Sequence, residues 1–146
     1  MSVPSASTAT VPLERIIRIA EFRACMRIFD RHVEQAARRN RLTPQRFLLL
    51  LQIEGAPESR QSVGIGELAE RLQLSPNSVT ELVTRAEEAG LVARAPSPDD
   101  ARAVQLRLTR TGRQRLHGVL VEIEGYRDEL RAAFEALSER FELTND

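Results

Sequence analysis

Residues 75–90 have the sequence SPNSVTELVTRAEEAG, and they determine how the rest of the chain is interpreted. Ser75 is a residue type that accepts hydrogen bonds from the free backbone N–H groups of a first helical turn, and Pro76 suits the first helical position. Gly90 suits the left-handed conformation that follows a helix end. The stretch therefore predicts a short helix with its own start and stop signals.

This predicted helix has two different faces. Its apolar residues recur at helical spacing and predict a face that packs on a core; they are Val79, Leu82, Val83 and Ala86. The opposite face carries small polar side chains and one acid, with Arg85 at its flank; these are Asn77, Thr80, Glu81 and Thr84. Such a helix can present polar groups to base edges in the DNA major groove. Because an ordinary solvated surface helix shows the same pattern, the helix alone leaves both interpretations open.

Composition limits the classes of function. The 146 residues suffice for one domain with a core, and 21 cations, all of them Arg, balance 21 acids. Overall charge therefore gives no support to nucleic-acid binding. Evidence for such binding must come from where the arginines lie in the chain. A single cysteine suits a reducing cytoplasm, and no apolar run reaches the roughly 20 residues that cross a bilayer. We expect a cytoplasmic protein without a membrane partner.

The amino-terminal part predicts a tail followed by a long helix. Residues 1–12 lack the basic start and apolar centre of a secretion signal, so we expect a disordered tail. Residues 13–41 carry an apolar seam with steps of three and four; it consists of Ile19, Phe22, Met26, Phe29, Val33 and Ala36. The other faces are rich in Arg. One interpretation is that these arginines form a solvated charged surface. The other is that they bind an acidic small molecule or the DNA backbone.

A second helix is predicted after Thr43, which can cap it, and Pro44, which can lead it. Residues 47–53 are apolar apart from one Gln, so we expect this helix to be buried at the centre of the domain. Residues 55–62 predict a loop, and residues 63–65 a very short strand.

A short helix from about Ile65 to Leu72 leads directly into Ser75. Two short helices joined by a tight turn match a helix-turn-helix, in which the second helix enters the groove. Residues 91–94 and 104–108 then alternate apolar with polar or small residues, as half-buried strands do. A helix-turn-helix followed by a hairpin is a winged helix.

The hairpin tip supplies a candidate minor-groove contact. Arg102 can enter a narrow minor groove, where the negative potential is strongest, and Asp100 can hold its guanidinium by a bidentate pair. The alternative for Arg102 is an exposed surface charge of little energetic consequence.

Several motifs follow one another in a specific order. They are LAERL at 68–72, LSP at 74–76, VT at 79–80, LV at 82–83, Arg85, EEAGLV at 87–92, Arg94, PxDxR at 98–102 and LTxxG at 108–112. Together they resemble the MarR family of bacterial transcription regulators, over roughly residues 13–137. The resemblance implies a mainly α fold. It also implies a winged helix-turn-helix at about 43–112, with a small β-hairpin as the wing. Long dimerisation helices at about 13–41 and 109–141 would complete one domain over 13–146.

The resemblance also implies a function. It indicates a homodimeric repressor on a near-palindromic double-stranded DNA operator, released by a small acidic or phenolic ligand or by cysteine oxidation. Carried over by position, the groove-facing residues are Pro76, Asn77, Ser78, Thr80, Glu81 and Thr84. Arg85 would contact phosphate or brace the helix. Asp100 and Arg102 match the family's pair of residues in the wing, and we call them the wing pair.

Three features depart from the family pattern. Glu81 stands where many relatives carry a basic or neutral residue; an acid can accept from cytosine N4 but is repelled by phosphate. Ala101 stands where Lys or Arg is common, which removes one wing cation. The chain ends at Asp146, where relatives commonly have a further dimerisation helix, and we expect Phe134, Phe141 and Leu143 to supply a shortened substitute.

The last predicted helix again has an apolar seam, formed by Leu116, Val119, Ile123, Tyr126, Leu130, Ala133 and Leu137. Two terminal helices with more apolar surface than one small domain needs predict pairing with a second subunit. The alternative is that they pack only on each other.

Other chemistry is sparse. His32 and His117 have no ligand-spaced partner, so we expect neither a metal site nor a cofactor, and no nucleophile–base pair indicates an enzyme. Cys25 lies between Arg23 and Arg27 and is a candidate redox sensor, although an inert buried cysteine is favoured. A winged-helix module that binds protein remains an alternative, because residues 43–112 hold 8 Arg against 9 acids.

Overall fold

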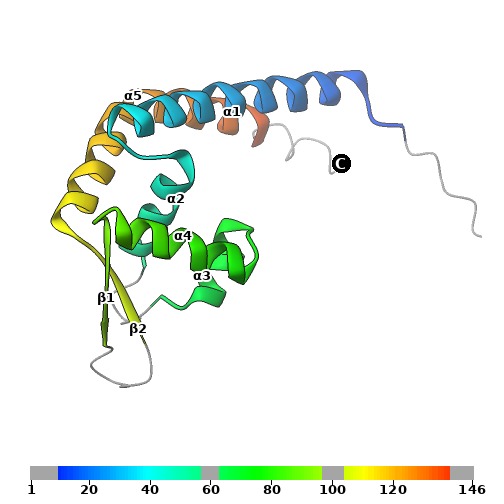
Figure 1. The fold of residues 1–146 in the computed structure, drawn as a ribbon. Coiled ribbons are helices and arrows are strands. Elements are labelled where there is room, and N and C mark those ends of the chain that lie inside the picture. Colours follow the sequence, from blue (N-terminus) through cyan, green and yellow to red (C-terminus); the bar gives the residue numbers. More distant parts are fainter. Residues whose placement is uncertain (1–9, 57–62, 97–103, 139–146) are drawn as a thin grey trace, which may run out of the picture. The chain divides into compact units, whose positions relative to one another are not determined.

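The computed structural model describes residues 10–56, 63–96 and 104–138, and Figure 1 shows that they are mainly helical. In chain order the elements are α1 (Leu13–Arg39), α2 (Pro44–Glu54), α3 (Ile65–Leu72), α4 (Pro76–Glu88), β1 (Val92–Pro96), β2 (Val104–Leu108) and α5 (Arg110–Ser138). The predicted fold class, a helical protein with a small antiparallel hairpin, is confirmed.

The chain divides into two compact units. Unit 2 is residues 32–124, and the described part of unit 1 is residues 10–31 and 125–138. The helices α1 and α5 contribute residues to both units. Every buried hydrophobic residue of the described chain belongs to unit 2, from Ala36 to Ile123.

Helix α2 begins as the sequence predicts. The Thr43 hydroxyl oxygen accepts from the backbone N–H of Arg46 at 3.2 Å, and Pro44 occupies the first turn. Phe47, Leu49, Leu50 and Ile53 are buried. The prediction that α2 is buried on nearly all sides was wrong at one position, because the side chain of Leu48 is 45% exposed.

The short strand predicted at residues 63–65 was also wrong. Helix α3 starts at Ile65, and the backbone N–H of Leu68 donates to the carbonyl of Gly64 at 3.1 Å, which closes the first helical turn. Val63 is buried without belonging to a strand.

Helix α4 has the predicted ends. The Ser75 hydroxyl oxygen accepts from the backbone N–H of Ser78 at 3.2 Å. At the other end Gly90 adopts a φ of 72°, in the left-handed region where a side chain is strained. The local signals alone therefore define this helix.

The hairpin is fixed at its base. β1 and β2 pair antiparallel, with Val92 opposite Leu108. Thr109 follows β2, and its backbone N–H donates to the carbonyl of Leu91 at 3.0 Å while its hydroxyl donates to the carbonyl of Gly90 at 2.6 Å. The same hydroxyl oxygen accepts from the backbone N–H of Gly112 at 3.1 Å and so caps α5. A Cβ on Gly112 would lie 2.1 Å from the Leu91 carbonyl oxygen, so this junction requires glycine.

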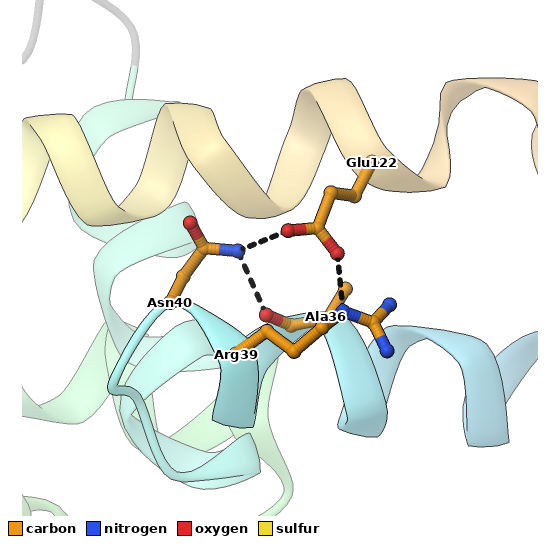
Figure 2. A network of polar contacts seen from close by, with 4 residues as sticks. All are labelled: Ala36, Arg39, Asn40 and Glu122. Atoms are coloured by element: carbon orange, nitrogen blue, oxygen red, sulfur yellow. Dashed lines mark hydrogen bonds and ion pairs between the residues drawn. The ribbon is translucent and has the colours of Figure 1, made fainter.

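A polar network joins the end of α1 to α5 within unit 2 (Figure 2). The Arg39 Nε donates to Glu122 Oε2 at 2.8 Å, and Asn40 Nδ2 donates both to Glu122 Oε1 at 2.9 Å and to the Ala36 carbonyl at 2.8 Å. The hydrogen bonds from Arg39 and Asn40 lower the pKa of the Glu122 carboxyl. Gly118 leaves room for this arrangement, because a Cβ there would lie 2.1 Å from Asn40 Oδ1.

Unit 1 has no buried residue among those the structure describes. Its aromatic pair, Phe22 and Phe134, has ring centroids 5.9 Å apart with the planes tilted by 57°. Apolar side chains that stay exposed are Val11, Leu13, Ile16, Ile17, Ile19, Ile28 and Phe134. None of the helices formed by the described residues combines the length and apolar character that a membrane crossing needs.

Candidate nucleic-acid interface

The turn between α3 and α4 sets the two helices against each other. Gln73 has a φ of 54°, and the backbone N–H of Leu74 donates to the carbonyl of Ala69 at 3.0 Å, so the chain reverses within three residues. Leu68 is completely buried beneath this turn. Figure 1 shows α3 and α4 packed together, with the β1–β2 hairpin following α4, as in a winged helix.

The two faces of α4 differ sharply in exposure. Val79, Leu82, Val83 and Ala86 are buried, which confirms the predicted packing face. The polar residues predicted to face the groove are all exposed; they are Pro76, Asn77, Ser78, Thr80, Glu81, Thr84 and Arg85. The structure thus places these residues at the surface of one helix, and their contact with DNA stays a prediction.

We call Thr80, Glu81 and Thr84 the α4 front. The Thr80 hydroxyl donates to the carbonyl of Pro76 at 3.0 Å, and the Thr84 hydroxyl donates to the carbonyl of Thr80 at 2.9 Å. The Glu81 carboxylate pairs through Oε1 with the guanidinium of Arg85 one turn later, and both side chains are 62% exposed. The role predicted for Arg85, a phosphate contact or a brace of the helix, stays a prediction.

A further residue links the hairpin to α4. The Arg94 Nε on β1 donates to Glu87 Oε2 at 2.9 Å, and its Nη2 donates to Thr84 Oγ1 at 3.4 Å. The sequence placed Arg94 in a motif but assigned it no role. The available signal was an acid in the last turn of a helix followed, after a glycine, by a base on the next strand.

The wing pair and the redox candidate lie in different parts of the chain. Asp100 and Arg102, like Ala101, lie outside the described residues. Cys25 is half-buried in unit 1, with its Sγ 4.0 Å from the Glu129 carbonyl oxygen, and its redox role stays a hypothesis. In the described part of the chain no three His, Cys, Asp or Glu side chains cluster as metal ligands would.

Comparison with known proteins finds similarity to one family. A model of the MarR family matches residues 42–103, which span α2, α3, α4 and β1. The chain is also 30% identical over 79 residues to the HTH-type transcriptional repressor MdtR of Bacillus subtilis (strain 168). The chain is thus similar to the MarR family over its winged-helix part. The MdtR match covers 54% of this chain and 48% of MdtR, so the chain spans about half the length of that relative.

Solved structures share the fold. A MarR family protein of Mycobacterium tuberculosis in complex with salicylic acid has a TM-score of 0.59 at 21% identity, with 85% of each chain covered. The M. tuberculosis transcriptional regulator MosR in complex with DNA has a TM-score of 0.56 at 24% identity, covering 78% of this chain and 80% of MosR. These likenesses establish the fold of this chain.

Proposed function

We propose that this chain is a homodimeric, sequence-specific DNA-binding regulator of transcription, a repressor that a small acidic or phenolic ligand releases from its operator. One observation carries the proposal: α4 is buried along its apolar face and exposed along its polar face, next to a hairpin tied to it by Arg94. A helix whose apolar face stays packed on the core can place its exposed polar face in a major groove. MosR, with the same fold, was solved with DNA.

The homodimer is supported by unit 1. Its exposed apolar side chains, such as Leu13 and Phe134, lie on long helices that form no buried core within the described part of one chain. A second copy would cover them and place two α4 helices about one DNA turn apart. A near-palindromic operator follows from that two-fold symmetry.

The ligand class is supported by charge and by a relative. Helix α1 carries many Arg, and guanidinium groups bind carboxylates and other planar anions well. A relative of the same fold was solved with salicylic acid, which is both phenolic and acidic. The same compound is therefore the first probe for release.

The test is a gel shift with duplexes from the chain's own upstream region, titrated with salt. Arg102→Ala should weaken binding and reduce the slope of log affinity against log salt by roughly 0.9 for each phosphate that is no longer neutralised. Arg127→Ala removes the same charge from α5 in unit 1 and serves as the control. Binding that is indifferent to Arg102→Ala, or no duplex retained even at low salt, would contradict the proposal.

A protein-binding winged helix is the second candidate. It is favoured by the near-neutral charge of residues 43–112 and by an exposed acid, Glu81, in the middle of α4. Failure to retain any duplex at low salt, together with an intact fold, would favour this candidate over DNA binding.

A further inference from the structure

Two threonine hydroxyls on the α4 front donate to backbone carbonyls of the same helix. Each hydroxyl carries one proton, and each bonds to a backbone carbonyl oxygen, which can only accept. The Thr80 proton is therefore committed to Pro76 at 3.0 Å, and the Thr84 proton to Thr80 at 2.9 Å. Both hydroxyls therefore act as acceptors toward other groups, and Thr84 Oγ1 already accepts from Arg94 Nη2 at 3.4 Å.

Glu81 lies between them in the sequence and adds further acceptors. Its carboxylate carries no proton when ionised, and Arg85 holds only Oε1, so Oε2 keeps its lone pairs available among the described residues. The side chain is 62% exposed and so remains accessible to a ligand. The three side chains of the α4 front thus form a surface that accepts hydrogen bonds and donates none.

A surface of acceptors discriminates among bases in the major groove. Guanine presents the acceptors O6 and N7, thymine the acceptor O4, and adenine the acceptor N7 beside its N6 amino group. Cytosine presents the N4 amino donor without an adjacent acceptor of its own. A front without protons therefore matches the N4 amino group of cytosine and opposes the acceptors of guanine and thymine, whereas adenine matches it at N6 but opposes it at N7.

We propose that Glu81 is a specificity-determining residue, which accepts a hydrogen bond from the N4 amino group of a cytosine in each half-site of the operator. Thr80 and Thr84 reinforce the choice, because neither has a proton for guanine O6 or N7. Arg85 holds the carboxylate by one oxygen and offsets its charge, which lowers the repulsion between Glu81 and nearby phosphates. This inference rests on the proposed DNA-binding function.

The experiment selects binding sites from a randomised duplex pool, with the wild-type chain, Glu81→Ala and Glu81→Gln in parallel. Wild type should select one cytosine per half-site at a position where Glu81→Ala shows no preference, with a loss of discrimination of roughly 5- to 150-fold. Glu81→Gln should select adenine there, because an amide pairs with adenine N6 and N7. Glu70→Gln makes the same charge change at an exposed position on α3 and should leave the selected site unchanged.

A modified base tests the contact directly. N4-methylcytosine keeps its pairing with guanine but replaces the major-groove proton of N4 with a methyl group. Placed at the selected position, it should weaken binding of the wild-type chain by roughly 5- to 150-fold and leave Glu81→Ala unaffected. Placed at a position where no base is preferred, it should change neither protein.

The outcomes separate the two proposals. If the wild-type chain retains duplex but selects an A·T pair, or no pair, at every position sensitive to Glu81, or if N4-methylcytosine is tolerated, the inference about cytosine is wrong and DNA binding stands. If no variant retains duplex at low salt while thermal melting shows folded protein, the proposed function fails and the inference fails with it.

Discussion

In unit 2 the side chains of Leu49, Leu50 and Val83 are completely buried, whereas in unit 1 Leu13 is 69% exposed and Phe134 is 56% exposed. Both units contain large apolar side chains, but among the described residues only those of unit 2 form a buried core. Exposed apolar side chains grouped on long helices mark a surface that associates. The comparison supports the proposals that unit 2 recognises DNA and that unit 1 mediates assembly.

The strongest test of this comparison is to make the unit 1 surface charged. Ile16→Glu with Ile17→Glu should convert the proposed dimer to monomer, since a dimer would have to bury both carboxylates. The loss of the second DNA-reading module should lower operator affinity by roughly 100-fold or more. Sedimentation and gel shifts measure the two effects.

The control is Gln35→Glu, which adds a carboxylate to an exposed polar position of the same helix. It should leave both assembly and affinity close to wild type. A double variant that sediments like wild type would refute the assignment of unit 1 to assembly.

Two glycines of α5 sharpen the comparison, because one lies in each unit. Gly112→Ala places a Cβ 2.1 Å from the Leu91 carbonyl oxygen and should lower the free energy of unfolding by roughly 1–3 kcal/mol. Gly125→Ala meets no atom within 4 Å and should raise it by up to about 1 kcal/mol through helix propensity. Urea denaturation measures both, and equal effects at the two positions would show that the close approach of α5 to Leu91 is unimportant.

The smallest expected effect is the pH dependence of the network around Glu122. Its pKa in the folded chain is lowered by hydrogen bonds from Arg39 and Asn40, so the ionised group stabilises the fold above its ordinary value of 4.5. That contribution is lost as the pH falls through the lowered pKa. Glu122→Gln should therefore be less stable than wild type at neutral pH, and the difference should shrink in acid.

The matched control is Glu124→Gln, which removes a carboxylate that forms no ion pair with the described residues. Denaturation curves at several pH values should show no comparable change for it. If the difference in unfolding free energy between wild type and Glu122→Gln stays the same in acid, the charge of Glu122 does not contribute to stability.

Features with local causes could be predicted from the sequence. Ser75 and Gly90 bound α4, Thr43 caps α2, and the alternation in residues 104–108 places β2, because each signal acts within a few residues. The exposure of Asn77, Thr80 and Glu81 followed from the same helical spacing.

Features with distant partners could not be predicted. Arg94 meets Glu87 and Thr84 only because the hairpin folds beside α4, and Glu122 meets Asn40 from 82 residues away. The strand predicted at residues 63–65 was wrong, because Gly64 is the N-cap of α3 and the first turn of that helix begins there instead. The wing pair, Asp100 and Arg102, stays a prediction.

Thr109 holds the two ends of the hairpin together through Gly90 and Leu91. Because the chain leaves and returns at one clamped point, the base of the hairpin is held independently of its tip. The strands themselves belong to the core, since Val92 and Leu108 are buried. Tips of other lengths can be grafted onto that base at a modest entropic cost, about 0.6 kcal/mol for each doubling of loop length.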